Sequence, residues 1–162
     1  MAVALDEIDV LLLTELEADA DRPNVALARL VGLSPAATLN RVRRLKESGV
    51  IRRIAARLDS AAAGFPLQVY VLVTLARHEE RAARRFAETV RGLPQIIAAD
   101  EVTGDVDAVL MIVARDVAGL QGVLASLSTR GGATRLVTLL RLGELKPSSP
   151  LPLSPAGAAR SR

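Results

Sequence analysis

Residues 24–51 read NVALARLVGLSPAATLNRVRRLKESGVI and decide the architecture of the N-terminal part of the chain. Asn24 can cap a short helix. Ser34 and Pro35 are a typical helix start, because serine accepts a hydrogen bond from a free amide and proline needs no donor at the first helical position. The helix that begins there ends at Gly49. Two helices joined by so tight a turn predict a helix-turn-helix, whose second helix enters the major groove of DNA.

The second of these helices has two different faces. At 100° per residue, Leu39, Val42 and Leu45 lie together with Thr38 beside them, so this side is expected to face the core. The other side carries small residues, which allow close approach to bases, and polar residues, which can donate hydrogen bonds to the duplex. A solvated basic face on a purely structural helix is the alternative interpretation. The residues expected to contact DNA are Ser34, Ala36, Ala37, Asn40, Arg41, Arg43, Arg44, Arg52 and Arg53.

Charge is distributed unevenly along the chain. The net charge of +3, from 21 basic and 18 acidic residues, does not by itself indicate a nucleic-acid partner. Residues 41–57, however, hold seven basic side chains and one acid, whereas residues 1–21 hold seven acids and no base. A local cationic stripe of this kind is typical of a surface that binds the phosphate backbone of double-stranded DNA.

The flanking segments complete an N-terminal domain over residues 1–60. Residues 6–18 place apolar side chains on one face of a helix with an acidic first turn. Residues 50–58 (VIRRIAARL) alternate apolar and basic positions, which predicts a short strand that serves as a hinge.

A second domain is expected over residues 64–146, where strand and helix patterns alternate. The order is βαββαβ, the split pattern of ferredoxin-like folds, so the whole chain is assigned to the α+β class. From Pro147 onward, proline, serine and alanine predominate, which predicts a disordered tail over residues 147–162. The expected elements are strands at 67–75, 96–102, 106–113 and 136–145, and helices at 79–91 and 116–127.

Composition excludes several classes of function. The chain has no cysteine and one histidine, so a thiolate zinc site or a cysteine nucleophile cannot be built. His78, Glu79 and Glu80 are adjacent and point in different directions at a helix start, so no metal site and no cofactor are expected. The acids within the apolar N-terminal stretch fit neither a signal peptide nor a membrane span, which favours a cytoplasmic protein without membrane contact.

Three motifs resemble the Lrp/AsnC family, the feast/famine transcription regulators. They are LDEID at 5–9, the quoted stretch at 24–51 and TGDVD at 103–107, and the resemblance extends over residues 5–146. It implies a homodimer formed by packing of the four-stranded sheets, further assembly to tetramers or octamers, and small amino acids as effectors. In that family the Gly-Asp-x-Asp loop helps to enclose the effector, which implies a role for Gly104, Asp105 and Asp107.

The same loop also has an ordinary structural interpretation, because Gly104 can supply a positive φ and the aspartates can satisfy turn amides. The chain departs from the usual family pattern at Ala108, where an aromatic residue is frequent, and at Gly131-Gly132, where Pro-Gly is usual. Loss of the aromatic side chain predicts a roomier pocket, which favours a bulky apolar or aromatic amino acid.

The leading hypothesis is a sequence-specific DNA-binding transcription regulator, not an enzyme, that is modulated by an amino acid. One alternative is an architectural protein that coats or bends DNA with little sequence preference. Another is a ferredoxin-like metabolic enzyme, since a fold does not determine a function. The enzyme hypothesis lacks a base or nucleophile cluster beyond Asp105 and Asp107, which lie on a turn.

Overall fold

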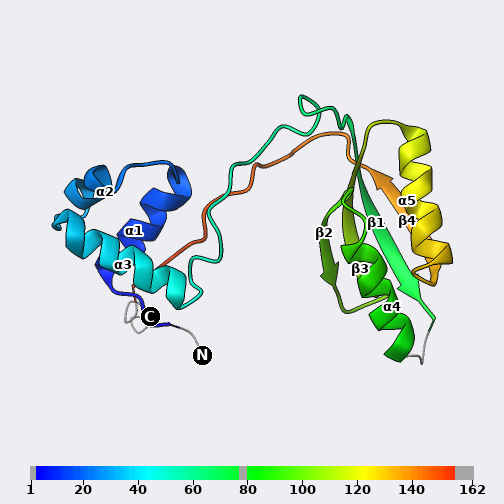
Figure 1. Cartoon of the computed structure of the whole chain (residues 1–162), viewed down its shortest axis with the longest axis horizontal. Coiled ribbons are helices and arrows are strands. Elements are labelled where there is room, and N and C mark those ends of the chain that lie inside the picture. The colour runs from blue at the N-terminus through cyan, green and yellow to red at the C-terminus, as the bar shows by residue number, and fades with distance from the viewer. Residues whose placement is uncertain (1–2, 77–79, 156–162) are drawn as a thin grey trace. The chain divides into compact units, whose positions relative to one another are not determined.

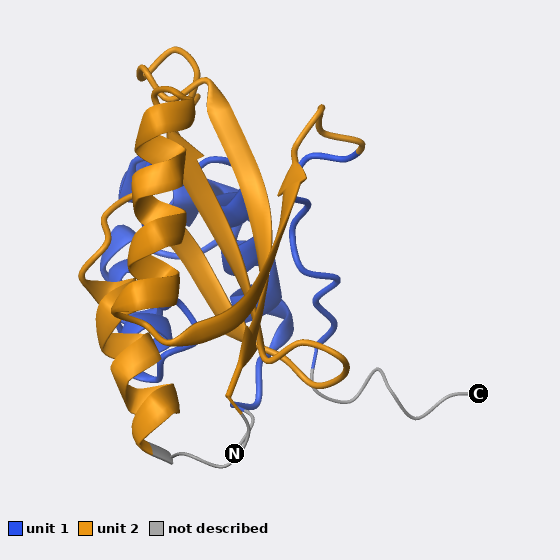
Figure 2. Ribbon diagram, turned by 90° about the vertical axis from the view of Figure 1, so that its right-hand side faces the viewer, with its two compact units in different colours: residues 1–57, 146–162 blue, residues 58–145 orange. Residues whose placement is uncertain are grey.

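The computed structural model describes residues 3–76 and 80–155, without the side chain of Glu80, and the chain divides into two compact units. Unit 1 comprises Met1–Arg57 together with Lys146–Arg162, and unit 2 comprises Leu58–Leu145 (Figures 1 and 2). The expected helix start at Glu79, the His78-Glu79-Glu80 cluster and the last seven residues of the expected tail lie outside the described residues.

Unit 1 contains three helices, α1 (Glu7–Ala18), α2 (Asn24–Leu30) and α3 (Pro35–Glu47). The start of α3 is as the sequence predicts, because the Ser34 hydroxyl accepts a hydrogen bond from the Ala37 N–H at 3.2 Å. The prediction for Asn24 is wrong. Pro23 is the N-cap of α2, and the Asn24 side-chain amide donates to the Pro35 carbonyl at 2.8 Å, so that it ties the two helices together. The core of unit 1 is formed by Leu12, Leu27, Val31 and Val42.

Two further expectations for unit 1 are wrong. Thr38, Val42 and Leu45 are buried as predicted. Leu39 is 49% exposed, because the neighbouring helices cover only part of the apolar side of α3. Residues 50–58 do not form a strand. A strand needs a partner for its ladder of hydrogen bonds. All strands within residues 3–76 and 80–155 pair in unit 2.

The last described residues, 147–155, belong to the expected tail. They form neither helix nor strand, and they group with unit 1. The Leu151 N–H donates to Oε1 of Glu17 on α1 at 3.3 Å. Leu151 and Leu153 line a cavity of about 760 Å³ with apolar residues of α1 and of residues 50–55, among them Leu16 and Ile54. The two leucines thus give a proline-rich segment apolar contacts that its composition does not suggest.

Unit 2 has the predicted βαββαβ order. Its antiparallel sheet has the strand order β2-β3-β1-β4. The last strand lies earlier in the chain than expected, because the turn at Gly131 and Gly132, whose φ is +74° at Gly132, leads directly into it. The elements are β1 (Leu67–Leu75), α4 (Glu80–Arg91), β2 (Ile96–Glu101), β3 (Ala108–Ala114), α5 (Val117–Thr129) and β4 (Ala133–Leu140).

The two faces of the sheet are in different environments. Both helices pack on one face (Figure 2), where alternate residues of β1 and β3 join Phe86 and Leu127 in the core. The register places a second set of side chains on the other face, which no helix of unit 2 covers. Tyr70 of β1 pairs there with Leu139 of β4, and both side chains are exposed. The set on this open face is Tyr70, Leu72, Val109, Met111, Val137 and Leu139.

No helix among the described residues is both long enough and apolar enough to span a bilayer.

Candidate nucleic-acid interface

The face of α3 that points away from the core carries groups suited to reading DNA. Ala36, Asn40 and Arg43 are exposed and lie on the side of α3 opposite Val42 and Leu45. An asparagine amide can bond an adenine edge with two hydrogen bonds, and an arginine can do the same to guanine or clamp a phosphate. The structure therefore leaves these three predicted residues accessible on one surface.

Two other predicted residues flank this surface at the start of α3. Ala37 is half-buried, and its N–H is occupied by the hydrogen bond to Ser34. Ser34 is exposed, but its hydroxyl is already engaged as the helix cap. Leu39, which sequence reasoning assigned to the core, instead adds an exposed apolar group beside Asn40. An apolar side chain in this position can contact a thymine methyl group.

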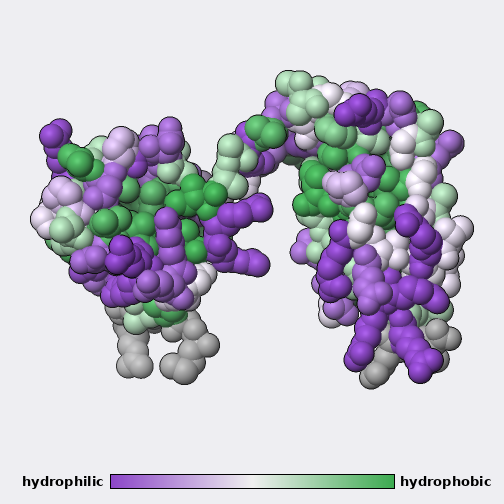
Figure 3. Space-filling view, viewed as in Figure 1, coloured by the Kyte–Doolittle hydropathy of each residue, from purple (hydrophilic) through white to green (hydrophobic). Residues whose placement is uncertain are grey.

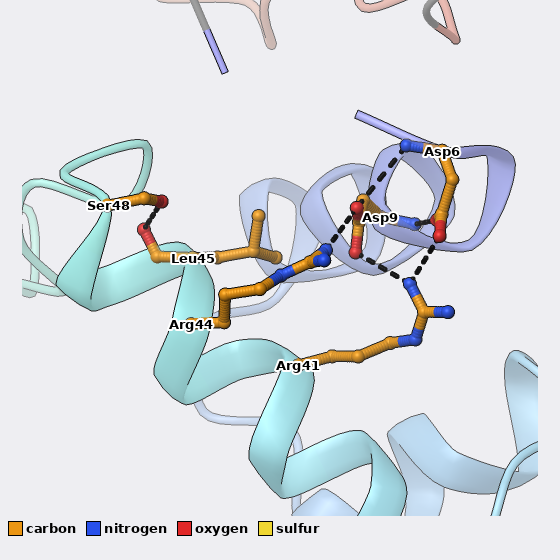
Figure 4. A network of polar contacts seen from close by, with 6 residues as sticks. All are labelled: Asp6, Asp9, Arg41, Arg44, Leu45 and Ser48. Carbon is orange, nitrogen blue, oxygen red and sulfur yellow. Dashed lines mark hydrogen bonds and ion pairs between the residues drawn. The ribbon is translucent and has the colours of Figure 1, made fainter. Parts of the chain in front are cut away.

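Arg41 and Arg44 have partners that the sequence analysis missed. Figure 4 shows both side chains extending from α3 toward the start of α1. Arg41 Nη1 lies 2.6 Å from Asp6 Oδ2 and 3.0 Å from Asp9 Oδ1, and Arg44 Nη2 bonds Asp9 Oδ2. The signal available in the sequence was the acidic first turn of α1, but its pairing with residues 32–35 positions away requires the tertiary fold.

The electrostatic environment favours the charged forms of Asp6 and Arg41. The hydrogen bond from Arg41 lowers the pKa of Asp6, and the N–H of Asp9 and the charges of Arg41 and Arg44 act in the same direction. Reciprocally, hydrogen bonds to Asp6 and then to Asp9 raise the pKa of Arg41. Asp6 and Arg41 therefore stay ionised at neutral pH.

Further cations follow α3 in unit 1. Lys46 in the last turn of α3 is exposed, as are Arg52 and Arg53 just after it. In Figure 3 hydrophilic side chains flank the hydrophobic middle of unit 1. Exposed cations at and after the end of α3 are suited to phosphate contacts, which position a protein on the duplex.

In unit 2 the predicted effector loop is a tight turn. Gly104 has φ +124°, in the region that favours glycine, and Asp105 is exposed. Asp107 is tied to β1, because its N–H donates to the Val73 carbonyl at 2.8 Å and its carboxylate accepts from the Leu75 N–H at 2.7 Å. Asp107 therefore has a structural role, but the amide that its carboxylate satisfies belongs to β1 and not to the turn.

Asp107 also borders a cavity of about 320 Å³ between α4 and the sheet, whereas Gly104 and Asp105 do not line it. The walls include Phe86, which is buried, and Ala108, whose small side chain leaves the space open. Sequence reasoning missed the charged lining of this cavity, which comes from Arg91, Asp100 and Glu101. Within the described residues, no group of three histidine or acidic side chains could hold a metal ion.

Comparison with known proteins agrees with this architecture. The model of the AsnC-type helix-turn-helix domain matches residues 5–46, and the model of the Lrp/AsnC ligand binding domain matches residues 68–151. The HTH-type transcriptional regulator AldR of Mycolicibacterium smegmatis is 36% identical over 148 residues, which cover 91% of this chain and 86% of AldR.

Two solved structures are also similar. The transcriptional regulator NMB0573 from Neisseria meningitidis, in complex with L-Met, superimposes with a TM-score of 0.84 at 29% identity, over 91% of this chain and 96% of that one. The feast or famine regulatory protein Rv3291c from M. tuberculosis, complexed with L-methionine, superimposes with a TM-score of 0.80 at 28% identity, over 89% and 96% of the two chains. From its two domains and these relatives, the chain belongs to the Lrp/AsnC family and is a DNA-binding transcriptional regulator, not an enzyme.

Proposed function

We propose that this regulator reads duplex DNA with the exposed face of α3. The observation that carries the proposal is the exposure of Asn40 and Arg43 on the side of the helix opposite its buried residues. Asn40 bonds an adenine edge and Arg43 contacts a guanine or a phosphate, while Ala36 and Ala37 allow close approach. Ser34 holds the start of the helix.

Phosphate contacts complete the proposed interface. Arg52 and Arg53, with Lys46, bind the backbone next to the groove that α3 enters. Such contacts release counterions and make the affinity depend strongly on salt, but they carry no sequence information. The proposed site of action is the cytoplasm, because chromosomal DNA is the proposed partner.

Substitution of Asn40 tests sequence reading. Asn40→Ala is expected to weaken binding to a preferred site by about 1–3 kcal/mol, with a smaller effect on random DNA. Gln121→Ala, which removes an exposed amide from α5, is the matched control and should leave both affinities unchanged. An equal loss on both DNAs would assign Asn40 to backbone positioning. Equal wild-type affinity for preferred and random DNA would instead support the architectural alternative.

We further propose that an amino acid modulates this regulator through unit 2. The cavity of about 320 Å³ has an apolar floor that includes Phe86 and Leu110, and it is lined by Arg91, Asp100 and Glu101. A cation and carboxylates together suit the two charged ends of an amino acid. The two related structures with L-methionine, and the small Ala108, support a large apolar side chain in the effector.

The adjoining loop of Gly104, Asp105 and Asp107 is proposed to couple effector binding to assembly. Calorimetry against all twenty amino acids, on the full chain, tests this. A large apolar amino acid should bind, Arg91→Gln should abolish the heat, and Asp105→Ala should remove the effect on assembly or operator affinity while DNA binding persists. Uniform silence with unchanged oligomer size would refute the proposal.

The open face of the sheet is proposed to form a homodimer. Its apolar set is left uncovered by the helices of unit 2, and a sheet with one uncovered apolar face needs a second layer. A second copy supplies the same face, as two-fold symmetry requires. Tetramers or octamers would then assemble from such dimers.

A further inference from the structure

Asp9 is a buried carboxylate at the junction of α1 and α3. Asp9 is 1% exposed, and its two carboxylate oxygens accept hydrogen bonds from Arg41, Arg44 and the N–H of Asp6. The Asp9 N–H in turn donates to Asp6 Oδ1 at 2.8 Å, which completes a capping box at the start of α1. Every oxygen of the Asp9 carboxylate therefore has at least one donor.

The two arginines are one turn apart on the proposed DNA-reading helix. Arg41 reaches both Asp6 and Asp9, and Arg44 reaches Asp9 alone. Guanidinium groups are planar and hold carboxylates with directional hydrogen bonds, so the pairs constrain geometry as well as charge. A buried carboxylate that loses such partners is strongly destabilised, which opposes exchange of these arginines onto another anion.

We propose that Asp9 is a positioning residue for DNA recognition. With Asp6, it holds Arg41 and Arg44 against α1, sets the orientation of α3, and withholds two positive charges from the DNA phosphates. Arg43, between them in sequence, has no such partner among the ion pairs of the described residues and stays directed to DNA. This inference rests on the proposal that α3 reads DNA.

The inference changes which basic residues are counted as DNA ligands. Two of the seven basic residues in residues 41–57 are neutralised within the unit by two acids from the oppositely charged N-terminal stretch. The uneven charge along the sequence is therefore partly an internal pairing, and sequence counting overstates the cationic charge that α3 offers to DNA.

Salt dependence of binding separates positioning from contact. The logarithm of the affinity falls with the logarithm of salt concentration by about 0.9 for each phosphate that a protein neutralises. We expect Arg43→Gln to flatten this slope when it binds a phosphate, or to relax specificity at one base when it binds guanine. Arg44→Gln and Arg41→Gln should leave the wild-type slope unchanged.

The charge-removing variant Asp9→Asn supplies the complementary test. Asparagine has nearly the same shape and keeps an acceptor for the Asp6 N–H, so the capping box can persist. Asp9→Asn leaves Arg44 without a carboxylate partner and leaves Arg41 with Asp6 alone. The salt slope on random DNA should steepen by about 0.9 for each arginine that then reaches a phosphate, and the preference for a specific site should fall. Adding Arg44→Gln in this background should remove part of the gain. A merely structural role would lower the melting temperature without steepening the slope.

One replacement variant and two contrary outcomes keep the test decisive. If Asp9→Asn does not fold, as judged by circular dichroism of the full chain, Asp6→Asn at a more exposed position replaces it. This variant should steepen the slope less, because Arg41 loses one of its two carboxylate partners and keeps Asp9. Flattening of the wild-type slope by Arg44→Gln or Arg41→Gln would overturn the inference. The proposed reading face of α3 is also wrong if Arg43→Gln changes neither the salt slope nor the specificity while Arg41→Gln and Arg44→Gln both flatten the slope.

Discussion

Replacing Leu139 with alanine tests the proposed dimer through the open face of the sheet. Leu139 lies on β4 opposite Tyr70 of β1, and 47% of its surface is exposed in the single chain. Its neighbour Leu140 is 57% exposed but pairs with Val69, so it points to the other face of the same strand. The two leucines differ mainly in the face of the sheet that they occupy.

The expected cost can be worked out from this exposure. Complete burial of a leucine side chain stabilises by about 1.5–3 kcal/mol, so covering the exposed half is worth roughly 1 kcal/mol in each copy. A two-fold dimer contains the residue twice. Leu139→Ala should therefore weaken the dimer by about 2 kcal/mol, which corresponds to roughly a 30-fold increase in the dissociation constant.

Sedimentation equilibrium of the full-length variants over a concentration series measures this constant. Leu139→Ala should dissociate at concentrations at which the wild type and Leu140→Ala remain dimeric. An unchanged constant for Leu139→Ala, or an equal weakening by both variants, would show that the open face is not the dimer interface and would refute the area argument.

Three further predictions concern stability. The pKa of Asp6 is below its ordinary value in the folded chain, so the pairing of Asp6 with Arg41 stabilises unit 1 above about pH 4. This stabilisation is lost as the pH falls through the lowered pKa. In acid unfolding followed by circular dichroism, Asp6→Asn should lack this pH-dependent part of the stability. Gly131→Ala should destabilise unit 2 by about 1–3 kcal/mol in thermal unfolding, because its Cβ would lie 2.5 Å from the Leu127 carbonyl oxygen, whereas Gly122→Ala in the open space of α5 should be neutral or stabilising. Leu151→Ser with Leu153→Ser should speed hydrogen exchange in α1 with a loss of about 1 kcal/mol, since Leu151 is already 68% exposed; unchanged exchange would show that the tail contributes nothing to unit 1.

Local signals were enough to predict most of the fold. Ser34 caps α3 as expected, and Asp116 caps α5 in the same way, because a cap depends on residues three positions apart. The alternation of buried valines in β1 follows directly from the period of a strand. The βαββαβ order follows from the succession of such patterns.

What could not be predicted depends on contacts between distant residues. Arg41 and Arg43 lie on different sides of α3, but the sequence does not show which side meets the carboxylates of α1. Residues 50–58 have the pattern of a strand, yet a strand exists only with a partner. Asp107 was assigned both to a turn and to the strand expected at 106–113, and it lies just before β3. The cavity beside it involves α4 and β2, which the sequence of the loop does not reveal.

Unit 1 is assembled from both ends of the chain, which has a consequence for its synthesis. Residues 146–155 supply Leu151 and Leu153 to the cavity of unit 1, and they leave the ribosome only after all of residues 58–145. At translation rates of about 5–20 residues per second, the other walls of this cavity stay uncovered for roughly 5–20 s after the helices have emerged. During that interval a nascent chain exposes apolar surface beside α1, and a stalled or truncated product would keep it exposed permanently. Residues 146–155 are therefore synthesised after the three helices of unit 1, among them α1, whose residues line the same cavity.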